Sequence, residues 1–436
     1  MSFDPLILSY ALPLLVIWVV YLGLRKKVDT SSRATLAAAK EAGLLEPASL
    51  HPKIDPAKCL GCGACVRACP EAAHNVLGMI DGKAELIEPT YCIGHGACKA
   101  SCPTDAITLV FGTESRGVDI PNVSPDFQTN VPGIFIAGEL GGMGLIRNAI
   151  EQGRQAMDSV RALDRLGRPD VYDVVIIGCG PAGFSASLAA MQHKLRFLTV
   201  EQDTFGGTVA HFPRGKLVMT APAQLPLIGQ VQFKEVSKET LIAFWHDAVK
   251  KTGLKVSCGE RVDSITQLEG DFEVTTTKGK YRTRSVLLTI GRRGTPRKLD
   301  VPGEDQPKVV YRLIDPEQYR GQHVLVVGGG DSALEAAASI AEESGTTVTL
   351  SHRSEAFGRA KLKNRQRVEA AQSSGQLKVI LRSSVKKIGA DYVEIEQGGE
   401  RTTIKNDGVI ICAGGILPND FLKKVGIQVE TKYGTA

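Results

Sequence analysis

The sequence predicts an α/β protein of several domains. A chain of 436 residues is too long for one domain, because single domains usually span roughly 100–200 residues. Two segments, 171–201 and 323–353, combine a strand of β-branched residues with a glycine-rich turn and a helical stretch. Such a repeated unit is typical of parallel sheets covered by helices. Seven of the ten cysteines lie between Cys59 and Cys102, which indicates a further small domain.

Composition sets broad limits on function. The chain is 43% hydrophobic and 23% charged, as expected for a folded protein, and its formal net charge is +5. This weakly basic balance is compatible with an anionic lipid surface or an acidic protein partner. It does not indicate nucleic-acid binding.

The N-terminal stretch predicts a membrane anchor. Leu6 to Leu24 carries no charge over 19 residues, and Arg25, Lys26 and Lys27 follow at once. About 20 apolar residues are enough to cross a bilayer, and the basic flank predicts that the bulk of the protein is cytoplasmic. A cleaved signal peptide is disfavoured because no basic segment precedes the stretch. A buried core helix is the other alternative.

The first cysteine run predicts iron–sulfur ligation. Cys59, Cys62, Cys65 and Cys69 follow the spacing C-x2-C-x2-C-x3-C and are followed by Pro70. Thiolate sulfur is the soft ligand that iron–sulfur clusters select, and the fourth cysteine of such a run serves the other cluster. A disulfide framework is disfavoured by this dense spacing in a long chain.

The second run departs from the pattern. Cys92, Cys98 and Cys102 keep their places, but His95 stands where the second cysteine is expected. Either the His95 imidazole binds iron, which generally raises the reduction potential, or the site holds a three-iron cluster or an open iron. The segment 50–111 resembles a dicluster bacterial ferredoxin. That resemblance implies one cluster on Cys59, Cys62, Cys65 and Cys102 and another on Cys69, Cys92, His95 and Cys98.

The first glycine turn predicts a dinucleotide site. A strand at 171–177 leads into Gly178, Gly180 and Gly183, and an acid, Glu201, closes the next strand 18 residues after Gly183. In such a unit the glycines permit a tight turn and close approach of the pyrophosphate, while the acid binds the ribose hydroxyls.

The second glycine turn has a different end. Gly328 and Gly330 follow the strand at 323–327, but the next strand ends in His352 and Arg353 instead of an acid. Arginine at this place accommodates the 2′-phosphate of NADP, so Arg353 and Arg359 favour NADPH over NADH.

Two such units in one chain resemble the thioredoxin reductase-like flavoproteins, including the bacillithiol-disulfide-reductase and ferredoxin-NADP-reductase groups. The resemblance rests on 206–209, 288–297, 301–304 and 413–419. It implies FAD at the first turn and NAD(P) at the second. Thioredoxin reductase has a redox C-x-x-C in its nicotinamide domain, and this chain has no cysteine between 306 and 405. An internal dithiol is therefore not expected.

The order of the segments predicts a circular permutation. Residues 129–139, with Gly138 and Glu139, and residues 144–153 resemble the C-terminal flavin motif of that group. Here they precede the first glycine turn, and the chain ends at 426–436, where the group would continue into the motif. We expect 112–165 to complete a flavin domain made of 171–305 and 405–436.

The sequence thus predicts two Rossmann-like dinucleotide-binding domains, a small α+β dicluster ferredoxin domain and one N-terminal transmembrane helix. The expected segments are an anchor (1–30), a linker helix (31–49), the ferredoxin domain (50–111), the FAD domain (112–305 and 405–436) and the NAD(P) domain (306–404). The expected cofactor-binding residues are Gly138, Glu139, Arg147, Asn148, Ala149, Gly178, Gly180, Pro181, Ala182, Gly183, Glu201, Gly207, Thr208, Gly291, Gly328, Gly330, Asp331, Ser332, Ala333, His352, Arg353, Arg359 and Gly414.

The expected function is electron transfer at a membrane. NAD(P)H would reduce FAD by hydride transfer, and FAD would pass single electrons to two iron–sulfur clusters. The external redox partner would be a membrane cytochrome, a quinone-linked protein or a ferredoxin. The reverse direction is equally allowed. Two alternatives are a cluster-fed flavoenzyme that reduces a small molecule or disulfide, and a redox sensor without steady turnover. No catalytic acid or base is required. Relatives of this group are commonly dimers, and the sequence leaves the oligomeric state open.

Overall fold

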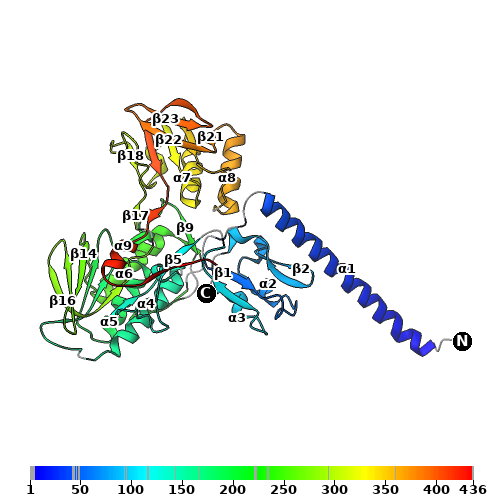
Figure 1. Ribbon diagram of the computed structural model, residues 1–436, viewed down its shortest axis with the longest axis horizontal. Helices are drawn as coiled ribbons and strands as arrows, with labels where there is room; N and C mark the ends of the chain where they lie inside the picture. Colours follow the sequence, from blue (N-terminus) through cyan, green and yellow to red (C-terminus); the bar gives the residue numbers. More distant parts are fainter. Residues whose placement is uncertain are drawn as a thin grey trace. The chain divides into compact units, whose positions relative to one another are not determined.

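The computed structural model (Figure 1) describes residues 5–41, 45, 47, 50–92, 94, 96–114, 117–142, 144–164, 166–219, 223–232, 235–292, 294–358 and 360–434. The chain divides into two compact units. The first unit comprises Met1–Gly117 with Tyr433–Ala436, and the second comprises Val118–Lys432.

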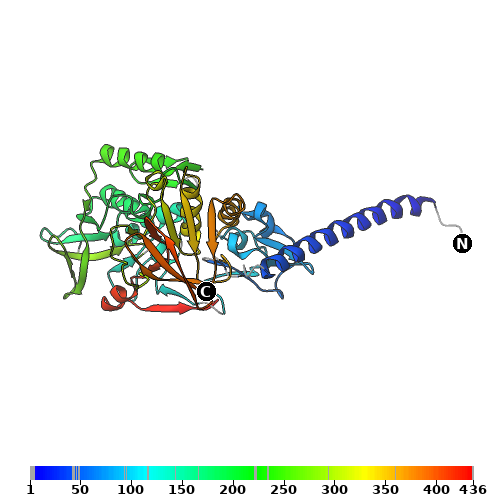
Figure 2. The same cartoon turned by 90° about the horizontal axis from the view of Figure 1, so that it is seen from above.

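The first unit begins with one long helix, α1 (Pro5–Glu41), which Figure 2 shows from above. Side chains between Leu12 and Leu24 are exposed, with Ile17 at 64% and Trp18 at 60%. The predicted anchor and linker helix are thus one continuous helix, whose second half is charged. Among the described residues, no helix combines the length and apolar character needed to span a bilayer. The predicted transmembrane anchor and membrane localisation are therefore not supported.

The remainder of the first unit is built from short antiparallel pairs and short helices. Strand β1 pairs with β4, and β2 pairs with β3 in a hairpin. The bounds are β1 (His51–Ile54), α2 (Ala64–Ala68), η1 (Ala72–His74), β2 (Leu77–Ile80), β3 (Lys83–Leu86), η2 (Pro89–Tyr91), α3 (Ala97–Ala100) and β4 (Ile107–Val110). Helices α2 and α3 each follow a glycine of positive φ, at Gly63 and Gly96. This arrangement agrees with the predicted small α+β domain.

The second unit contains a seven-stranded sheet in the order β13-β8-β7-β16-β15-β14, with β6 also paired to β16. Strands β13, β8, β7, β16 and β6 pair in parallel, whereas β14, β15 and β16 pair antiparallel. The bounds are β6 (Ile134–Ile136), β7 (Tyr172–Ile177), β8 (Phe197–Glu201), β13 (Ser257–Cys258), β14 (Val262–Gln267), β15 (Phe272–Thr276) and β16 (Lys280–Leu288).

Helices and short strands flank this sheet. They are η3 (Glu139–Gly141), α4 (Ile146–Arg161), α5 (Pro181–Gln192), η4 (Gly207–Val209), β9 (Leu217–Met219), β10 (Ala223–Leu225), β11 (Gly229–Val231), β12 (Glu235–Ser237) and α6 (Lys238–Thr252). Helix α5 is apolar on all sides and buries most of its residues, because both the sheet and other helices cover it.

Residues 118–164 belong to the same core as the first glycine turn. Strand β6 adds to the sheet beside β16, and α4 packs on α5. Phe135, Met157 and Val160 are buried in one cluster with Val174 and Ile176 of β7. At the other end of the chain, β27 (Val429–Lys432) pairs antiparallel with β5 (Val118–Pro121).

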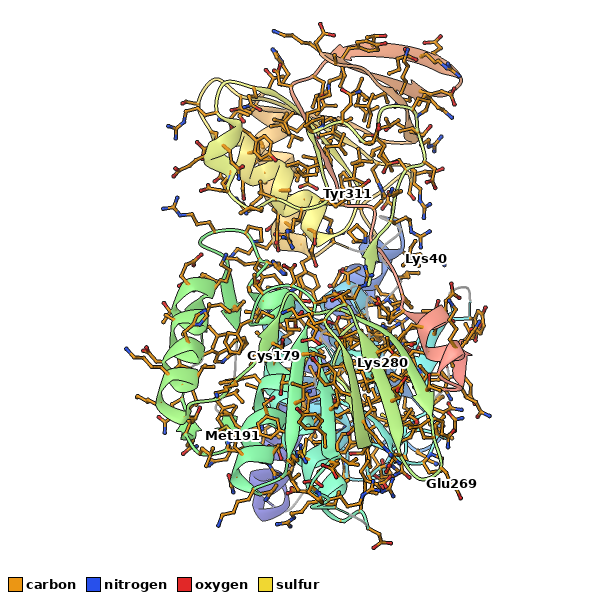
Figure 3. All side chains as sticks on the ribbon, turned by 90° about the vertical axis from the view of Figure 1, so that its left-hand side faces the viewer. Lys40, Cys179, Met191, Glu269, Lys280 and Tyr311 are labelled. Atoms are coloured by element: carbon orange, nitrogen blue, oxygen red, sulfur yellow. The ribbon has the colours of Figure 1, made fainter. Side chains whose placement is uncertain are left out.

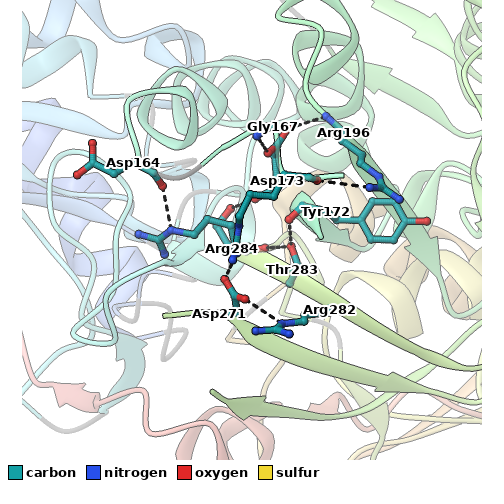
Figure 4. A network of polar contacts seen from close by, with 11 residues as sticks. Asp164, Gly167, Tyr172, Asp173, Arg196, Asp271, Arg282, Thr283 and Arg284 are labelled. Carbon is teal, nitrogen blue, oxygen red and sulfur yellow. Dashed lines mark hydrogen bonds and ion pairs between the residues drawn. The ribbon is translucent and has the colours of Figure 1, made fainter. Parts of the chain in front are cut away.

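A polar network surrounds the connection from α4 to β7 (Figure 4). Asp173 accepts hydrogen bonds from the backbone N–H groups of Gly167, at 2.5 Å, and Arg196, at 2.8 Å. Asp271 pairs with Arg168 and, at 2.9 Å, with Arg282. Hydrogen bonds and ion pairs thus join the connection between α4 and β7 to the seven-stranded sheet.

The second glycine turn lies in a five-stranded parallel sheet of order β18-β25-β19-β20-β21. Figure 3 shows this part above the larger sheet, with Tyr311 labelled. The bounds are β18 (Val309–Val310), η5 (Pro316–Tyr319), β19 (His323–Val327), α7 (Asp331–Ala341), β20 (Thr347–Ser351), α8 (Leu362–Ser373), β21 (Leu377–Ile380) and β25 (Gly408–Ile411). An antiparallel sheet of β22 (Ser383–Ile388), β23 (Tyr392–Gln397) and β24 (Glu400–Lys405) adjoins it.

Two chain crossings join the parts of the second unit. Strand β17 (Thr295–Pro296) pairs antiparallel with β26 (Gly415–Ile416), after which α9 (Asn419–Lys424) follows. Both crossings run between the larger sheet and the five-stranded sheet. The predicted flavin segment 405–436 is divided in the structure: β25 belongs to the five-stranded sheet, whereas Leu422 and Ile427 are buried with the larger sheet. Residues up to Gly117 of the predicted segment 112–165 fall in the first unit.

Candidate cofactor sites

One cavity of the first unit gathers four thiols. Cys59, Cys62, Cys65 and Cys102 line it together with Thr104. The first three come from one loop that runs into α2, and Cys102 follows α3. The backbone N–H of Ala106 donates to the Cys102 sulfur at 3.3 Å. This is the four-cysteine set that ferredoxin resemblance implies for one cluster.

A second cavity gathers the other three. Cys69, Cys92 and Cys98 line it, with Glu71 and Gly94 beside them. Cys69 follows the first run but lies with the second, as expected for the fourth cysteine of a ferredoxin run. His95, the predicted fourth ligand, lies outside the described residues, so its ligation stays a prediction.

The chemistry of the donors suits clusters. All ten cysteines are described, and none of them forms a disulfide bond. Burial raises the pKa of Cys92 to about 11 and raises the pKa of Cys98, so these thiols bind metal only with release of their protons. Within the described ranges, no three His, Cys, Asp or Glu side chains are grouped tightly enough for a single ion. A cluster spaces its ligating sulfurs more widely than one ion does.

The first glycine turn has the shape of a phosphate cradle. Gly178 has φ +98°, and a Cβ there would lie 2.7 Å from the Thr289 carbonyl oxygen. A Cβ at Gly183 would lie 2.0 Å from the Gly178 carbonyl oxygen, so only glycine lets α5 approach the turn. Gly180 is the N-cap of α5, whose Pro181 and Ala182 form the first turn. A helix N-terminus next to open backbone binds phosphate.

Further predicted residues meet this turn. A Cβ at Gly207 would lie 2.9 Å from the Gly180 Cα atom, so the loop with Thr208 touches the glycine turn. The buried Glu201 accepts hydrogen bonds from the backbone N–H groups of Cys179, at 2.7 Å, and Asp203, at 3.1 Å. Cys179 is labelled in Figure 3. These contacts hold the Glu201 carboxylate beside the turn, where a ribose would lie.

The early segment brings its predicted residues to the same place. A Cβ at Gly138 would lie 3.0 Å from the Ala182 Cβ atom and 3.7 Å from the Ala149 Cβ atom. Gly153 of α4 lies against the Ala182 carbonyl oxygen, 2.1 Å from where its Cβ would stand. In the first turn of α4, Arg147 is exposed and Asn148 is half-buried.

Glu139 lies near a cation that we did not predict. Its side chain is exposed to solvent, yet desolvation by the surrounding protein raises the pKa of the carboxyl, and Arg292 opposes this rise. Desolvation lowers the pKa of Arg292, while Glu139 and Asp119 raise it. The Arg292 guanidinium donates to the Asp119 carbonyl oxygen at 2.9 Å. Neighbouring Gly291 has φ +64° and open space around it.

Two residues near the first glycine turn were not predicted as site residues, although the segment that contains them was. Thr289 donates from its hydroxyl to the Ile177 and Gly178 carbonyl oxygens at 2.9 and 2.8 Å, which fixes the glycine turn. Arg292 is the other. Both belong to 288–297, and their place at the carboxyl end of a parallel strand beside the turn was the available signal.

The second glycine turn packs against the backbone that directly follows β25. A Cβ at Gly328 would lie 2.4 Å from the Cys412 carbonyl oxygen and 3.0 Å from the Ala333 Cβ atom. Gly330 caps α7 and has open space around it, as has Gly414. Asp331 accepts hydrogen bonds from the Lys361 N–H and the Asn364 amide, both at 2.8 Å. The remaining predicted residue of this turn, Ser332, is exposed.

The basic end of β20 is only partly described. The His352 ring packs on Gly329, where a Cβ would lie 2.1 Å from the ring, and stacks on Phe357 with centroids 5.4 Å apart. Arg353 is exposed beside it. Arg359 lies outside the described residues. The structure therefore brings His352 to the second turn. The roles of Arg353 and Arg359 stay predictions.

Comparisons with known proteins agree with this geometry. A family model described as pyridine nucleotide-disulphide oxidoreductase matches residues 175–435, and one described as a 4Fe-4S dicluster domain matches 51–103. A ferredoxin–NADP reductase of Ignicoccus hospitalis is 30% identical over 270 residues, which cover 60% of this chain and 83% of that protein. A bacilliredoxin reductase of Bacillus subtilis is 27% identical and covers 60% of this chain and 82% of that protein.

A solved structure supports the fold of the flavin and nucleotide parts. The bacillithiol disulfide reductase of Staphylococcus aureus matches with a TM-score of 0.52 and 27% identity, covering 59% of this chain and 80% of that chain. The first family model spans more than half of the chain. The chain is therefore an NAD(P)H-dependent FAD oxidoreductase with a dicluster ferredoxin domain, and it belongs to the pyridine nucleotide-disulphide oxidoreductase family.

Proposed function

We propose that this protein transfers electrons between NAD(P)H and its two iron–sulfur clusters through FAD, and exchanges them with an external redox protein. The observation that carries the proposal is the pair of thiol-lined cavities in a chain that also holds two glycine turns. Bound FAD would take a hydride from the nicotinamide and pass single electrons to the clusters.

The distribution of cysteines favours clusters as the exit for electrons. The part between 306 and 405 has no cysteine, so the nicotinamide domain cannot supply a dithiol. Cys179 is fully buried in the first glycine turn, and burial raises the pKa of its thiol well above the ordinary value. Such a thiol is a poor nucleophile for a disulfide substrate.

The residues of the chain serve binding and orientation in this proposal. Glu201 would bind the FAD ribose, Glu139 and Arg292 would face its ribityl and ring end, and the α5 N-terminus would bind pyrophosphate. At the second turn, Arg353 would bind the 2′-phosphate of NADPH. We therefore propose NADPH as the preferred nucleotide.

An anaerobic titration with NADPH and NADH tests the relay. Flavin absorbance and low-temperature EPR are recorded on the same samples of reconstituted protein. Bleaching of the flavin followed by cluster signals is the expected result. As a control, dithionite establishes how much cluster signal the protein can give. If the flavin bleaches but clusters that dithionite can reduce stay oxidised, the result would count against transfer from NADPH to the clusters. The reverse direction would then be tested with reduced ferredoxin as electron donor and NADP⁺ as acceptor.

A further inference from the structure

The charged half of α1 lies on the β2–β3 hairpin within the first unit. The Ser32 hydroxyl accepts a hydrogen bond from the Met79 N–H at 3.1 Å, and Ser32 is only 6% exposed. A Cβ at Gly78 would lie 2.7 Å from the Ser32 hydroxyl oxygen, so glycine allows this contact. Ala39, seven residues after Ser32, is also buried. One face of the helix is therefore docked, from about residue 25 onward.

Three charged residues of that face converge on the tip of the hairpin. The tip is Asp81-Gly82, and both residues have positive φ, as a two-residue hairpin turn requires. Asp29 accepts from the Asp81 N–H at 2.6 Å and pairs with Arg33 at 2.6 Å. Arg33 also pairs with the Asp81 carboxylate. The Arg25 guanidinium lies over Gly82, 2.1 Å from where a Cβ would stand.

The tip in turn touches the cysteine loop. A Cβ at Gly61, between Cys59 and Cys62, would lie 1.9 Å from the Gly82 carbonyl oxygen. The next residue, Lys83, donates from its ammonium group to the Cys59 carbonyl oxygen at 2.6 Å. The Lys83 ammonium group is thus fixed on the backbone of Cys59, one of the residues that line the four-thiol cavity. The three-thiol cavity is lined instead by Glu71, an acid.

We propose that Arg25, Asp29 and Arg33 form a clamp that holds the hairpin tip on the Cys59–Cys65 loop, and that Lys83, held by this clamp, raises the reduction potential of the four-cysteine cluster. The proposal rests on the proposed function only in that clusters occupy both cavities. A fixed positive charge favours the reduced, more negative state of a cluster, so it raises the reduction potential, and a nearby carboxylate lowers it.

The clamp acts through position more than through stability. Arg33 and Asp81 are largely exposed, and exposed ion pairs contribute little to the free energy of unfolding. Arg33 and Asp29 are therefore positioning residues, and the readouts must report on the cluster. Suitable readouts are the two midpoint potentials and the rate at which a chelator removes iron.

The experiment is a dithionite-mediated EPR redox titration of the full chain and four variants. Lys83→Gln should lower the potential of one cluster and leave the other unchanged. Arg33→Gln should shift the same cluster in the same direction by less, and should speed chelator removal of about half of the iron several-fold. Arg33→Lys should have a potential and a rate of iron removal between those of Arg33→Gln and the wild type. Lys27→Gln, an exposed neighbour on α1, is the control and should match the wild type.

Two outcomes would overturn the proposal. Equal potentials for Lys83→Gln and wild type would remove the role of Lys83. An Arg33→Gln protein indistinguishable from Lys27→Gln in both readouts would remove the clamp. Dithionite replaces the nucleotide in this test, so a failed relay from NADPH leaves it unaffected. Wild-type protein that cannot be loaded with two clusters would refute the proposed function first.

Discussion

Arg353 offers the most direct residue-level test of nucleotide preference. It is exposed and follows His352, whose ring packs on Gly329 of the second glycine turn. An arginine at this place of the motif accommodates a 2′-phosphate. A hydrogen bond to a charged group is worth about 1.5–3 kcal/mol, so Arg353→Gln should lower kcat/KM for NADPH by roughly 10–150-fold. The value for NADH should stay within about two-fold, because NADH lacks that phosphate.

Diaphorase assays with a flavin-linked dye give both constants. Arg382→Gln is the matched control, because Arg382 is an exposed arginine that pairs with Glu355 at 2.8 Å. Equal loss with NADPH and NADH would show that Arg353 does not read the 2′-phosphate.

The hydrogen bonds of Glu304 lead us to expect that the free energy of unfolding falls at acid pH. Burial alone would raise the pKa of Glu304, but hydrogen bonds from the Leu299 N–H, the Tyr311 hydroxyl and the Asp300 N–H lower it overall. A carboxyl with a lowered pKa stabilises the folded state fully above its unfolded value, about 4.3, and loses that contribution as pH falls through the folded value.

The variant Glu304→Gln isolates this contribution. At pH 7 we expect it to lower the free energy of unfolding by about 1–3 kcal/mol, because its hydrogen bonds no longer involve a charge. The difference from wild type should persist down to about pH 5 and shrink below about pH 4.3. Urea unfolding midpoints across this range measure it, with Asp305→Asn as the control. A difference that is constant down to pH 3 would contradict the assignment.

At the scale of elements, the contact of α4 with α5 depends on one glycine. A Cβ at Gly153 would lie 2.1 Å from the Ala182 carbonyl oxygen, at the start of the helix that caps the first glycine turn. Gly153→Ala gains about 1 kcal/mol of helix propensity but forces the helices apart, at a cost of about 1–3 kcal/mol. We expect a net loss of stability and a lower FAD content.

Thermal release of FAD, followed by flavin fluorescence, measures both effects. The control is Gly23→Ala in α1, because that helical glycine has open space around it and should only gain propensity. Gly153→Ala protein with wild-type FAD content and an unchanged release temperature would mean that α4 and α5 tolerate separation.

Motif-bearing elements were predictable because their chemistry is local. The strand, glycine turn and helix at Gly178 and at Gly328 depend on backbone constraints that short sequences encode. Thr289 and Arg292 were missed as site residues because only strand pairing brings them to the first turn. The order of paired strands cannot be read from the sequence. The N-terminal helix was predicted, but its role was not supported. The apolar stretch continues into a charged half that docks on the β2–β3 hairpin.

At the scale of the whole chain, the order of the segments is the remaining question. We propose that residues 118–164 are the displaced end of the flavin domain. Strand β27 ends at Lys432, which lies directly opposite Val118, the first residue of antiparallel β5. A two-residue turn could therefore join Lys432 to Val118 without moving either strand. Strand β6 and helix α4 would then follow β5 as they do in this chain.

A rearranged chain tests this proposal. It begins at Gly167, runs to Lys432, continues through Asn-Gly and ends with residues 118–164. Its new ends fall in the connection between α4 and β7, where Gly167 keeps its bond to Asp173. We expect it to bind FAD with the same stoichiometry as the unrearranged piece 118–432, because every core contact of β6 and α4 is kept.

The matched control is residues 167–432 alone, which lack β6 and α4 and so expose Val174 and Ile176, both fully buried in the second unit. Exposure of a core side chain costs about 1.5–3 kcal/mol, so the shortened piece should lose FAD and aggregate. FAD absorbance per protein and NADPH diaphorase activity compare the three pieces. If the rearranged chain behaves like the shortened one, the fixed order β5–β6–α4–β7 is needed for folding. The displaced-segment proposal would then have to be abandoned, even though the two ends lie opposite each other.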